Sequence, residues 1–380
     1  MSTFPYNGTY QVGVGFAPYM LRHLEVLLGE EHAPMMKVDQ LGLLKFTQEA
    51  SPIVSMNNGM NLQQIQVPFK QRWTALDTQT TPSCDYANNQ QYQEVSVGIT
   101  NFRQIPIALQ DQTVQQYELE ASETVALGLP PTQAMNEVMK EIYAAAAGLL
   151  AGVNQDLWSL FVANLGTNPN QGNSSNVSIN IEKDITLLPL NDGITQIQAD
   201  AQNNNVTGKL NVIGSGFAQQ FFLQQPFKEP QFNGLDTAAQ SNSMPFYNDP
   251  YATTALGSNQ IVVVEENAIQ RVDFMQFTGT YAGQRPGRSI FATLKLPIQM
   301  NGSVHDVDFD MQLIYSDCAT TYTSPYAQIG GYSTVTIQRG WNIILSKYFG
   351  LFTVPANAYR TYDNQYGNRG TFRYTLSNNS

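Results

Sequence analysis

One stretch, Pro131 to Gly166, constrains the fold more than any other part of the chain. Its apolar side chains recur every three or four residues, the spacing of an amphipathic helix. They are Met135, Met139, Ile142, Ala146, Leu149, Val153, Leu157 and Leu160. Pro130 and Pro131 supply a helix start, and Gly166 followed by Pro169 supplies a stop. At about 1.5 Å per residue, a helix over 131–165 would be roughly 50 Å long, far above the mean for globular domains.

The polar residues of this helix are expected to lie largely off the apolar stripe. They are Glu137, Lys140, Glu141, Asn154, Gln155 and Ser159. Gly148 and Gly152 are one turn apart, so the helix either bends there or is approached closely by another backbone. The helix is therefore the predicted spine of the fold.

Charge is scarce on this chain. Charged residues make up 13% of the 380 residues, and the net charge is −11. Soluble domains usually carry about a quarter of charged residues, so a surface this neutral suits a protein that is largely covered by neighbours, although secreted β-rich proteins share the bias. The acidic balance and the lack of a basic run argue against a basic nucleic-acid groove.

The first residues, MSTFPYNGTYQVGVGF, lack the pattern of a signal peptide, and no apolar window is long enough to span a bilayer. We therefore expect a chain made in the cytoplasm, without a membrane contact. The two cysteines, Cys84 and Cys318, are expected to be free thiols in such a compartment.

Leu62 to Gln110 has the two-residue period of strands. The alternating apolar residues are Ile65, Val67 and Phe69, and then Val95, Val97 and Ile99. Between them lies a polar tip, residues 77–91, without an apolar pattern. The prediction is a long two-stranded hairpin, and because such a ribbon is marginal in water by itself, we expect it to rest on another surface.

The rest of the chain alternates short strands with loops. Residues 177–211 show only weak strand-like pieces, and Phe16 to Leu28 could form a short helix. A strand and glycine turn are expected to lead into a helix over 216–225, and a hairpin is expected to turn at Asn301–Gly302. Further strands are expected at 261–264, 334–337, 341–345 and 371–376.

No spacing of histidines or cysteines matches a metal site, because His23, His32 and His305 are isolated and no CxxC pair occurs. The nearest cluster joins His305 to three aspartates. In a strand, Asp306, Asp308 and Asp310 would share one face and His305 the other, so a solvated acidic face is favoured over a cation site.

Enzymatic patterns are equally weak. Gly214-Ser215-Gly216 after a strand could hold a nucleophile or a phosphate, but it lacks the full GxSxG and Walker patterns, and a tight turn is favoured. Glu265, Glu266 and Asp273 could serve as acid or base, yet nothing in the sequence fixes their separation. We expect no enzyme and no cofactor.

One basic turn remains, Arg285-Pro286-Gly287-Arg288, with Arg271 and Lys295 on its two sides. In an acidic chain, Arg285 and Arg288 form either a contact for a carboxylate on a neighbour or a solvated turn.

The order of these elements resembles that of the major capsid proteins of tailed bacteriophages: an arm, a long hairpin, a spine helix, a mixed α/β region and a second hairpin. The carboxyl-terminal stretch from Gly340 to Pro355 and the ending TFRYTLSN also look like the endings of phage coat proteins. The resemblance implies an α+β chain with the Hong Kong 97-like capsid fold, shared with encapsulins and herpesvirus shells. It implies assembly as hexamers and pentamers into an icosahedral shell around double-stranded DNA.

Carried over element by element, the resemblance implies a division of the chain. The parts are residues 1–61 (N-arm), 62–116 (E-loop hairpin), 117–200 (P-domain with the spine helix 131–165), 201–275 (A-domain), 276–325 (P-domain strands) and 326–380 (completion of the A-domain and C-terminal strand).

The resemblance also implies partners and contacts. The chain would be made in the host cytoplasm, end in the virion, and meet a separate scaffolding protein, a portal, decoration proteins and packaged DNA, the last without sequence specificity. The expected intersubunit contacts are Asp77, Cys84, Asp85, Tyr86, Arg285 and Arg288. Cys84 at the hairpin tip would face a neighbour, and an intersubunit disulfide with Cys318 is a hypothesis.

Three alternatives remain open. An encapsulin-like compartment shares the fold and differs in its cargo. A secreted or surface-layer β-rich protein fits the composition, and a carbohydrate-active enzyme fits the scattered carboxylates and aromatics.

Overall fold

The predicted spine folds as one helix in the computed structural model: α4, Gln133–Ala163, with 31 residues. The stripe from Met139 to Leu157 is buried, Leu160 is half-buried, and most of the polar residues are exposed, as predicted. Asn154 is the exception. It is wholly buried because its amide bonds to Asp249 and to the backbone of Leu44, so its expected place off the stripe is wrong.

The structure describes only part of the chain. The described residues are 36–37, 41–49, 64–70, 92–99, 101–109, 133–168, 175–180, 193–224, 244–274, 283–285, 289–300, 303–316, 319–323, 334–356 and 367–377. The expected helix over 16–28 and the polar hairpin tip lie outside them, and the assigned domain boundaries stay predictions.

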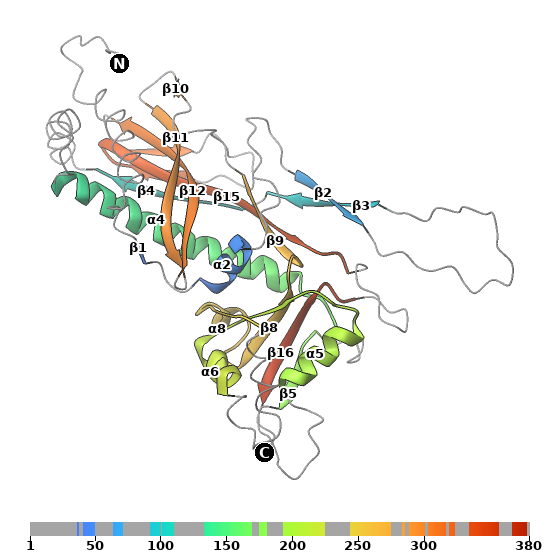
Figure 1. Ribbon diagram of the computed structural model, residues 1–380. Coiled ribbons are helices and arrows are strands. Elements are labelled where there is room, and N and C mark those ends of the chain that lie inside the picture. Colours follow the sequence, from blue (N-terminus) through green and yellow to red (C-terminus); the bar gives the residue numbers. More distant parts are fainter. Residues whose placement is uncertain are drawn as a thin grey trace, which may run out of the picture.

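A seven-stranded sheet lies against α4 (Figure 1). Its main path is β1 (Met36–Lys37), β11 (Ser289–Met300), β12 (Ser303–Ser316), β15 (Gly340–Thr353) and β4 (Asn101–Ala108), with β10 (Gly283–Arg285) on β11 and β9 (Ile269–Phe274) on β15. β11 and β12 pair in unbroken register from Ser289 with Ile314 to Met300 with Ser303, which confirms the hairpin predicted around Asn301–Gly302.

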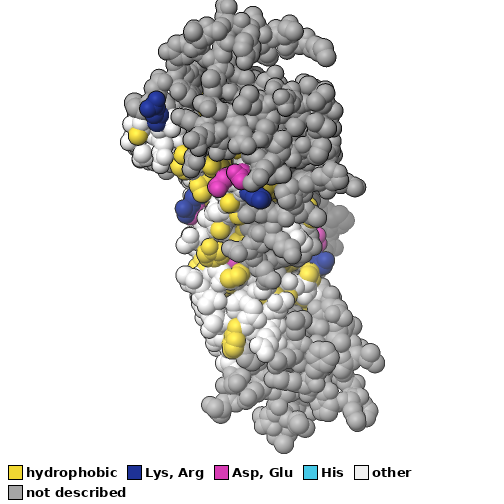
Figure 2. Space-filling model, turned by 90° about the vertical axis from the view of Figure 1, so that its left-hand side faces the viewer, with side chains coloured by type: hydrophobic (Ala, Val, Ile, Leu, Met, Phe, Trp, Pro, Cys, Tyr) yellow, Lys and Arg dark blue, Asp and Glu magenta, His cyan; other side chains and the backbone are white. Residues whose placement is uncertain are grey.

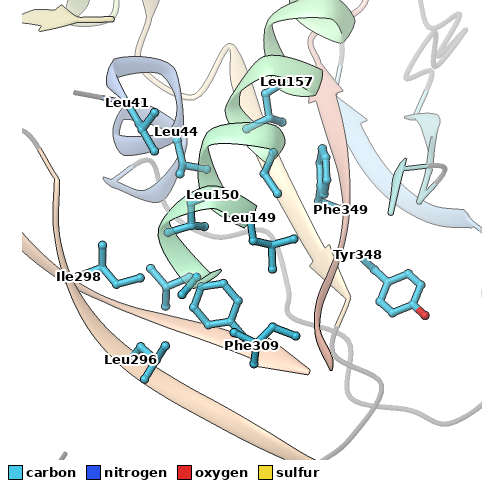
Figure 3. Packing of buried hydrophobic residues seen from close by; sticks show 14 of the residues in the cluster. Leu41, Leu44, Leu149, Leu150, Leu157, Leu296, Ile298, Phe309, Tyr348 and Phe349 are labelled. Atoms are coloured by element: carbon cyan, nitrogen blue, oxygen red, sulfur yellow. The ribbon is translucent and has the colours of Figure 1, made fainter. Parts of the chain in front are cut away.

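The main hydrophobic core fills the space between this sheet and α4 (Figure 3). Leu149 and Leu157 of α4 approach Phe309 of β12 and Phe349 of β15, while the neighbouring Tyr348 points to the opposite side of β15 (Figure 3). This alternation follows from the pleat of a strand, which sends successive side chains to opposite faces.

A second, five-stranded sheet lies beyond one end of α4 (Figure 1). Its order is β5 (Val177–Asn180), β16 (Thr371–Ser377), β8 (Gln260–Glu265), β6 (Leu210–Gly214) and β7 (Phe246–Asn248). The helices α6 (Gly216–Gln224) and α8 (Ala252–Ala255) accompany it. The predicted strand, glycine turn and helix over 210–225 and the buried strand at 261–264 are confirmed.

The helix α5, Gly193–Asn203, was not predicted. Ile194, Ile197 and Ala201 have helical spacing, and the last two are buried in the core of the second sheet. The hydroxyl of Tyr374 in β16 donates to Asp200 of this helix at 3.0 Å, so a polar contact also fastens α5 to the sheet.

A short helix and two strand pairs complete the described fold. The helix α2, Gly42–Glu49, packs against α4 and places Leu44 in the main core, together with Leu41 directly before the helix. β13 (Thr320–Thr323) pairs with β14 (Thr334–Ile337), and β2 (Gln64–Lys70) pairs with β3 (Tyr92–Gly98). The β2–β3 ribbon extends to one side of the body (Figure 1).

Candidate assembly surfaces

The β2–β3 ribbon exposes two strand edges among the described strands. Its antiparallel register runs from Gln64 with Gly98 to Lys70 with Tyr92, and neither strand pairs with any other strand that the structure describes. Unpaired N–H and C=O groups on such edges are a template for another chain. The predicted two-stranded unit is therefore present, and its edges are the first candidate assembly surface.

The ribbon is held to the body at its root. Val97 and Ile99 are buried in the main core, at 4% and 2% exposure. Two residues later the chain enters β4, which pairs with β15 from Asn101 to Ala108. The root is thus fixed by packing, whereas the rest of the described ribbon is paired only with itself.

A buried carboxylate joins the helices to the second sheet. Asp249, wholly buried, accepts hydrogen bonds from the backbone N–H of Leu43 at 3.0 Å, from the indole N–H of Trp158 at 2.9 Å and from the Asn154 amide at 3.0 Å. The N–H of Tyr251 donates to its other oxygen. Burial raises the pKa of Asp249, although these donors oppose the rise.

The sequence contained no signal for this junction. Asp249 lies 95 positions from Asn154 and 206 from Leu43, so only the fold brings the three together. The strand β7 ends directly before Asp249. Pro250 follows, in a stretch whose sequence is typical of a loop.

A cluster of three charged side chains lies within the seven-stranded sheet. The Lys347 ammonium is 2.9 Å from Asp273 and also donates to the carbonyl of Asp308 at 3.0 Å. The guanidinium of Arg271 donates two hydrogen bonds to the same Asp273 carboxylate, at 2.7 and 2.8 Å. Burial alone would raise the pKa of Asp273, but the two cations outweigh it and hold that pKa at about 2.

Three of the candidate catalytic groups named from the sequence, Asp273, Ser215 and Glu265, have hydrogen-bond partners within the fold. Asp273 stays ionised at neutral pH, so it has no proton to donate. The Ser215 hydroxyl donates to the Ser258 carbonyl at 2.9 Å and accepts from the N–H of Ala218 at 3.2 Å, which makes it the cap of α6. Glu265 accepts a hydrogen bond from the N–H of Gly208.

The acidic face predicted on β12 is only partly present. Asp306 and Asp308 are exposed, and Asp306 is 3.2 Å from Lys295 on β11. Asp310 is buried at 1% exposure, at the point where β12 begins to pair with β15 and Asp310 is opposite Ser346. Among the described residues, no group of three or more histidine, cysteine or acidic side chains could hold a metal ion.

The other residues proposed as contacts are not brought together by the described structure. Asp77, Cys84, Asp85 and Tyr86 at the hairpin tip lie outside the described residues, as do Arg288 and Cys318. The backbone of Arg285 ends β10 opposite Ser289. These contacts and the disulfide stay predictions.

The described surface is mostly neutral on the face shown in Figure 2, where few charged side chains appear among the coloured atoms. Among the side chains that the structure describes, two large apolar ones are exposed: Phe217 of α6 at 51% and Val304 of β12 at 48%. No described helix is long and apolar enough to cross a membrane.

Comparison with known proteins gives likenesses of structure alone. No protein-family model matches the chain, and no curated protein matches it. Its structure is similar to the capsid of the cyanophage P-SCSP1u, with 9% identity, a TM-score of 0.40 and 86% of both chains covered. A chain from Mycobacterium phage Bobi matches with 11% identity, a TM-score of 0.41, and 92% of this chain and 94% of that one covered.

A virus-like particle from Pyrococcus furiosus is also similar, with 7% identity, a TM-score of 0.33, and 90% of this chain and 99% of that one covered. These three neighbours come from two phages and a virus-like particle.

Proposed function

We propose that this chain is a major capsid protein with the Hong Kong 97-like fold. Its copies would assemble as hexamers and pentamers into an icosahedral shell that encloses double-stranded DNA. The chain would then act in the virion, with no membrane contact.

The observation that carries this proposal is the ribbon. β2 and β3 extend from a body whose core holds Val97 and Ile99 at their root, and no other described strand pairs with their edges (Figure 1). Because an isolated two-stranded ribbon is marginal in water, another surface must stabilise it. A second copy of the chain is the occupant we propose, since a shell supplies a neighbour to every ribbon.

The neutral surface supports the same proposal. Only 13% of the residues are charged, and two large apolar side chains of the described body are exposed. Interfaces between subunits lack charge at their centres, whereas a free surface usually carries more of it. The proposal includes contacts with a scaffolding protein, a portal and decoration proteins, and non-specific contact with packaged DNA.

The proposal gives the chain no catalytic reaction. Ser215 caps a helix, and Asp273 lies between two cations, so each has a role in holding the fold. An encapsulin-like compartment remains the nearest alternative, because it differs in cargo rather than in shell.

Negative-stain microscopy with light scattering tests the proposal on the full chain, expressed alone and with a candidate scaffolding protein. We expect hollow shells, tubes or rings with masses far above the 42.1 kDa of one chain. A monodisperse monomer under both conditions would contradict the proposal. The ratio of absorbance at 260 and 280 nm of particles from infected cells separates packaged DNA from a protein cargo.

A further inference from the structure

The root of the ribbon crosses β15 at a single glycine. β4 pairs along β15 until Asn101 is opposite Phe349, and the chain on the other side of Ile99 belongs to the ribbon. The next residue of β15 is Gly350. Gly98, the last residue of β3, lies over it.

This crossing leaves no room for a side chain. A Cβ atom built on Gly350 would lie 2.5 Å from the carbonyl oxygen of Gly98 and 3.3 Å from a methyl group of Val97. Real Cβ contacts are essentially never shorter than 3.0 Å, so either backbone would have to shift. The two strands are therefore in direct backbone contact.

On the β15 side, the crossing is held by strand pairing. Gly350 is opposite Val272 of β9, and the flanking Phe349 and Leu351 are opposite Asp273 and Arg271. The last two form the buried charge cluster with Lys347. On the ribbon side, Val97 and Ile99 are buried in the main core. We therefore expect a bulkier residue at position 350 to tilt the outer part of the ribbon about this root, while β15 keeps its place in the sheet.

A small displacement at the root becomes a large one along the ribbon. β3 has seven residues, which at about 3.3 Å each give a length of roughly 23 Å. A tilt of about ten degrees at the root would move the far end by about 4 Å, because displacement grows with distance from the pivot.

We infer that the backbone crossing of Gly98 over Gly350 is the pivot that sets the direction in which the ribbon leaves the body. On the proposed function, on which this step rests, that direction also determines where the neighbouring copy lies. Gly350 is then a positioning residue for assembly.

The pivot is tested on the unassembled full chain, so that the result does not depend on shell formation. Spin labels replace Glu94 on β3 and Glu141 on the exposed side of α4, in a chain whose Cys84 and Cys318 are changed to serine. Pulsed electron resonance then measures the distance between the labels in the parent chain and in Gly350→Ala. Glu94 is four residues from Gly98, about 13 Å along the strand, so we expect the same tilt to shift the main distance by about 2 Å.

Gly152→Ala is the matched control. A Cβ there would be 3.6 Å from the Arg103 side chain, an ordinary contact, so we expect the distance to stay unchanged. An unchanged distance in a Gly350→Ala chain that melts as cooperatively as the parent would overturn the pivot.

If Gly350→Ala does not fold, Val97→Ala tests the same contact without adding volume. It removes the methyl group that lies 3.3 Å from the built Cβ, so we expect a broader distance distribution. A distribution as narrow as that of the parent would refute the pivot.

The effect on assembly is a separate measurement. We expect Gly350→Ala to change particle diameter or to give tubes, while Gly152→Ala gives particles like those of the parent. Unchanged particles would overturn the link between pivot and shell. Failure of the parent itself to assemble would count against the proposed function and leave the distance test valid.

Discussion

Two antiparallel hairpins of this chain look alike in sequence and differ in their surroundings. The β11–β12 hairpin lies within the seven-stranded sheet, where β12 is covered on its outer edge by β15. Its residues Leu296, Ile298 and Phe309 are buried between the sheet and α4 (Figure 3). The β2–β3 ribbon pairs only with itself among the described strands.

The difference shows where the fold obtains its stability. Both hairpins have the alternating pattern of strands. β11 and β12 lie in the centre of the seven-stranded sheet and supply many core residues, whereas the ribbon pairs with no other described strand and is joined to the core at Val97 and Ile99. Regions with few buried contacts open at low free energy, whereas core strands open only with the whole molecule. The ribbon is thus available for a partner at little cost to the body.

Proline substitutions in the two hairpins give the largest expected contrast. Met311 of β12 pairs with Ala292 on one side and Leu345 on the other, so Met311→Pro removes ladder bonds in the sheet centre. We expect it to lower the free energy of unfolding by about 4 kcal/mol or more. Val95→Pro in β3 should change it by less than about 1 kcal/mol. Urea unfolding followed by tryptophan fluorescence measures both.

The same pair of variants separates folding from assembly. We expect Val95→Pro to keep a folded body and to lose large particles in light scattering. If Val95→Pro unfolded the body as Met311→Pro does, the ribbon would belong to the cooperative core and the comparison would fail.

Asp249→Ala should have the next largest effect. It leaves the N–H of Leu43, the indole N–H of Trp158 and the Asn154 amide without their buried acceptor. Because unsatisfied buried donors cost about 1–3 kcal/mol each, we expect a loss of about 3 kcal/mol after some relaxation. Hydrogen exchange should be faster at the backbone N–H of Leu43, which donates to Asp249 and so joins α2 to this junction.

Asp306→Asn is the control for this prediction. Asp306 faces solvent and pairs with the equally exposed Lys295, so its removal should cost less than about 0.5 kcal/mol. Equal losses of unfolding free energy in both variants would mean that the buried hydrogen bonds of Asp249 stabilise the fold no more than a surface ion pair does.

Local patterns in the sequence predicted much of this fold, because period and turn chemistry act over short distances. The helix over 131–165, the turn at Asn301–Gly302 and the strand at 261–264 each leave such a local signal. The seven-stranded pairing does not, since the sequence contains no information that β15 lies between β12 and β4.

The candidate site was less predictable for the same reason. Asn154 reads as a surface residue on its helix, but it is buried because Asp249, far along the chain, supplies its partner. Asp310 was predicted to belong to an exposed acidic row, but it is buried where β12 begins to pair with β15. No sequence pattern around Gly350 indicates its role. Only the close approach of the Gly98 backbone explains why this position has no side chain.

Lys347→Met tests how much the ion pair between β15 and β9 stabilises the fold. We expect a smaller loss of unfolding free energy than for Asp249→Ala. The pKa of Asp273 is about 2 against an ordinary 3.8, so its ionised form stabilises the fold above pH 3.8, and this contribution is lost as the pH falls toward 2. The full contribution is about 2 kcal/mol. Without Lys347 the pKa should rise, because only Arg271 then faces the carboxylate.

Unfolding in urea at pH 5 and at pH 3 measures this effect. We expect Lys347→Met to be less stable than the parent at pH 5 by about 1–2 kcal/mol, and the difference to shrink at pH 3. A difference that stays constant with pH would assign the loss to packing against Phe309 rather than to the charge pair.

The smallest expected effect concerns the strand that directly follows the ribbon. Arg103 of β4 binds Asp156 of α4 with two bonds, at 2.6 and 2.7 Å, but its side chain is 43% exposed. Asp156→Asn should therefore cost only about 0.5 kcal/mol and less in high salt, because water and ions screen such a pair. A double-mutant cycle with Arg103→Gln, read by urea unfolding at low and high salt, isolates the coupling. A coupling above about 2 kcal/mol would mean that charge, and not only the burial of Val97 and Ile99, holds the ribbon root against the body.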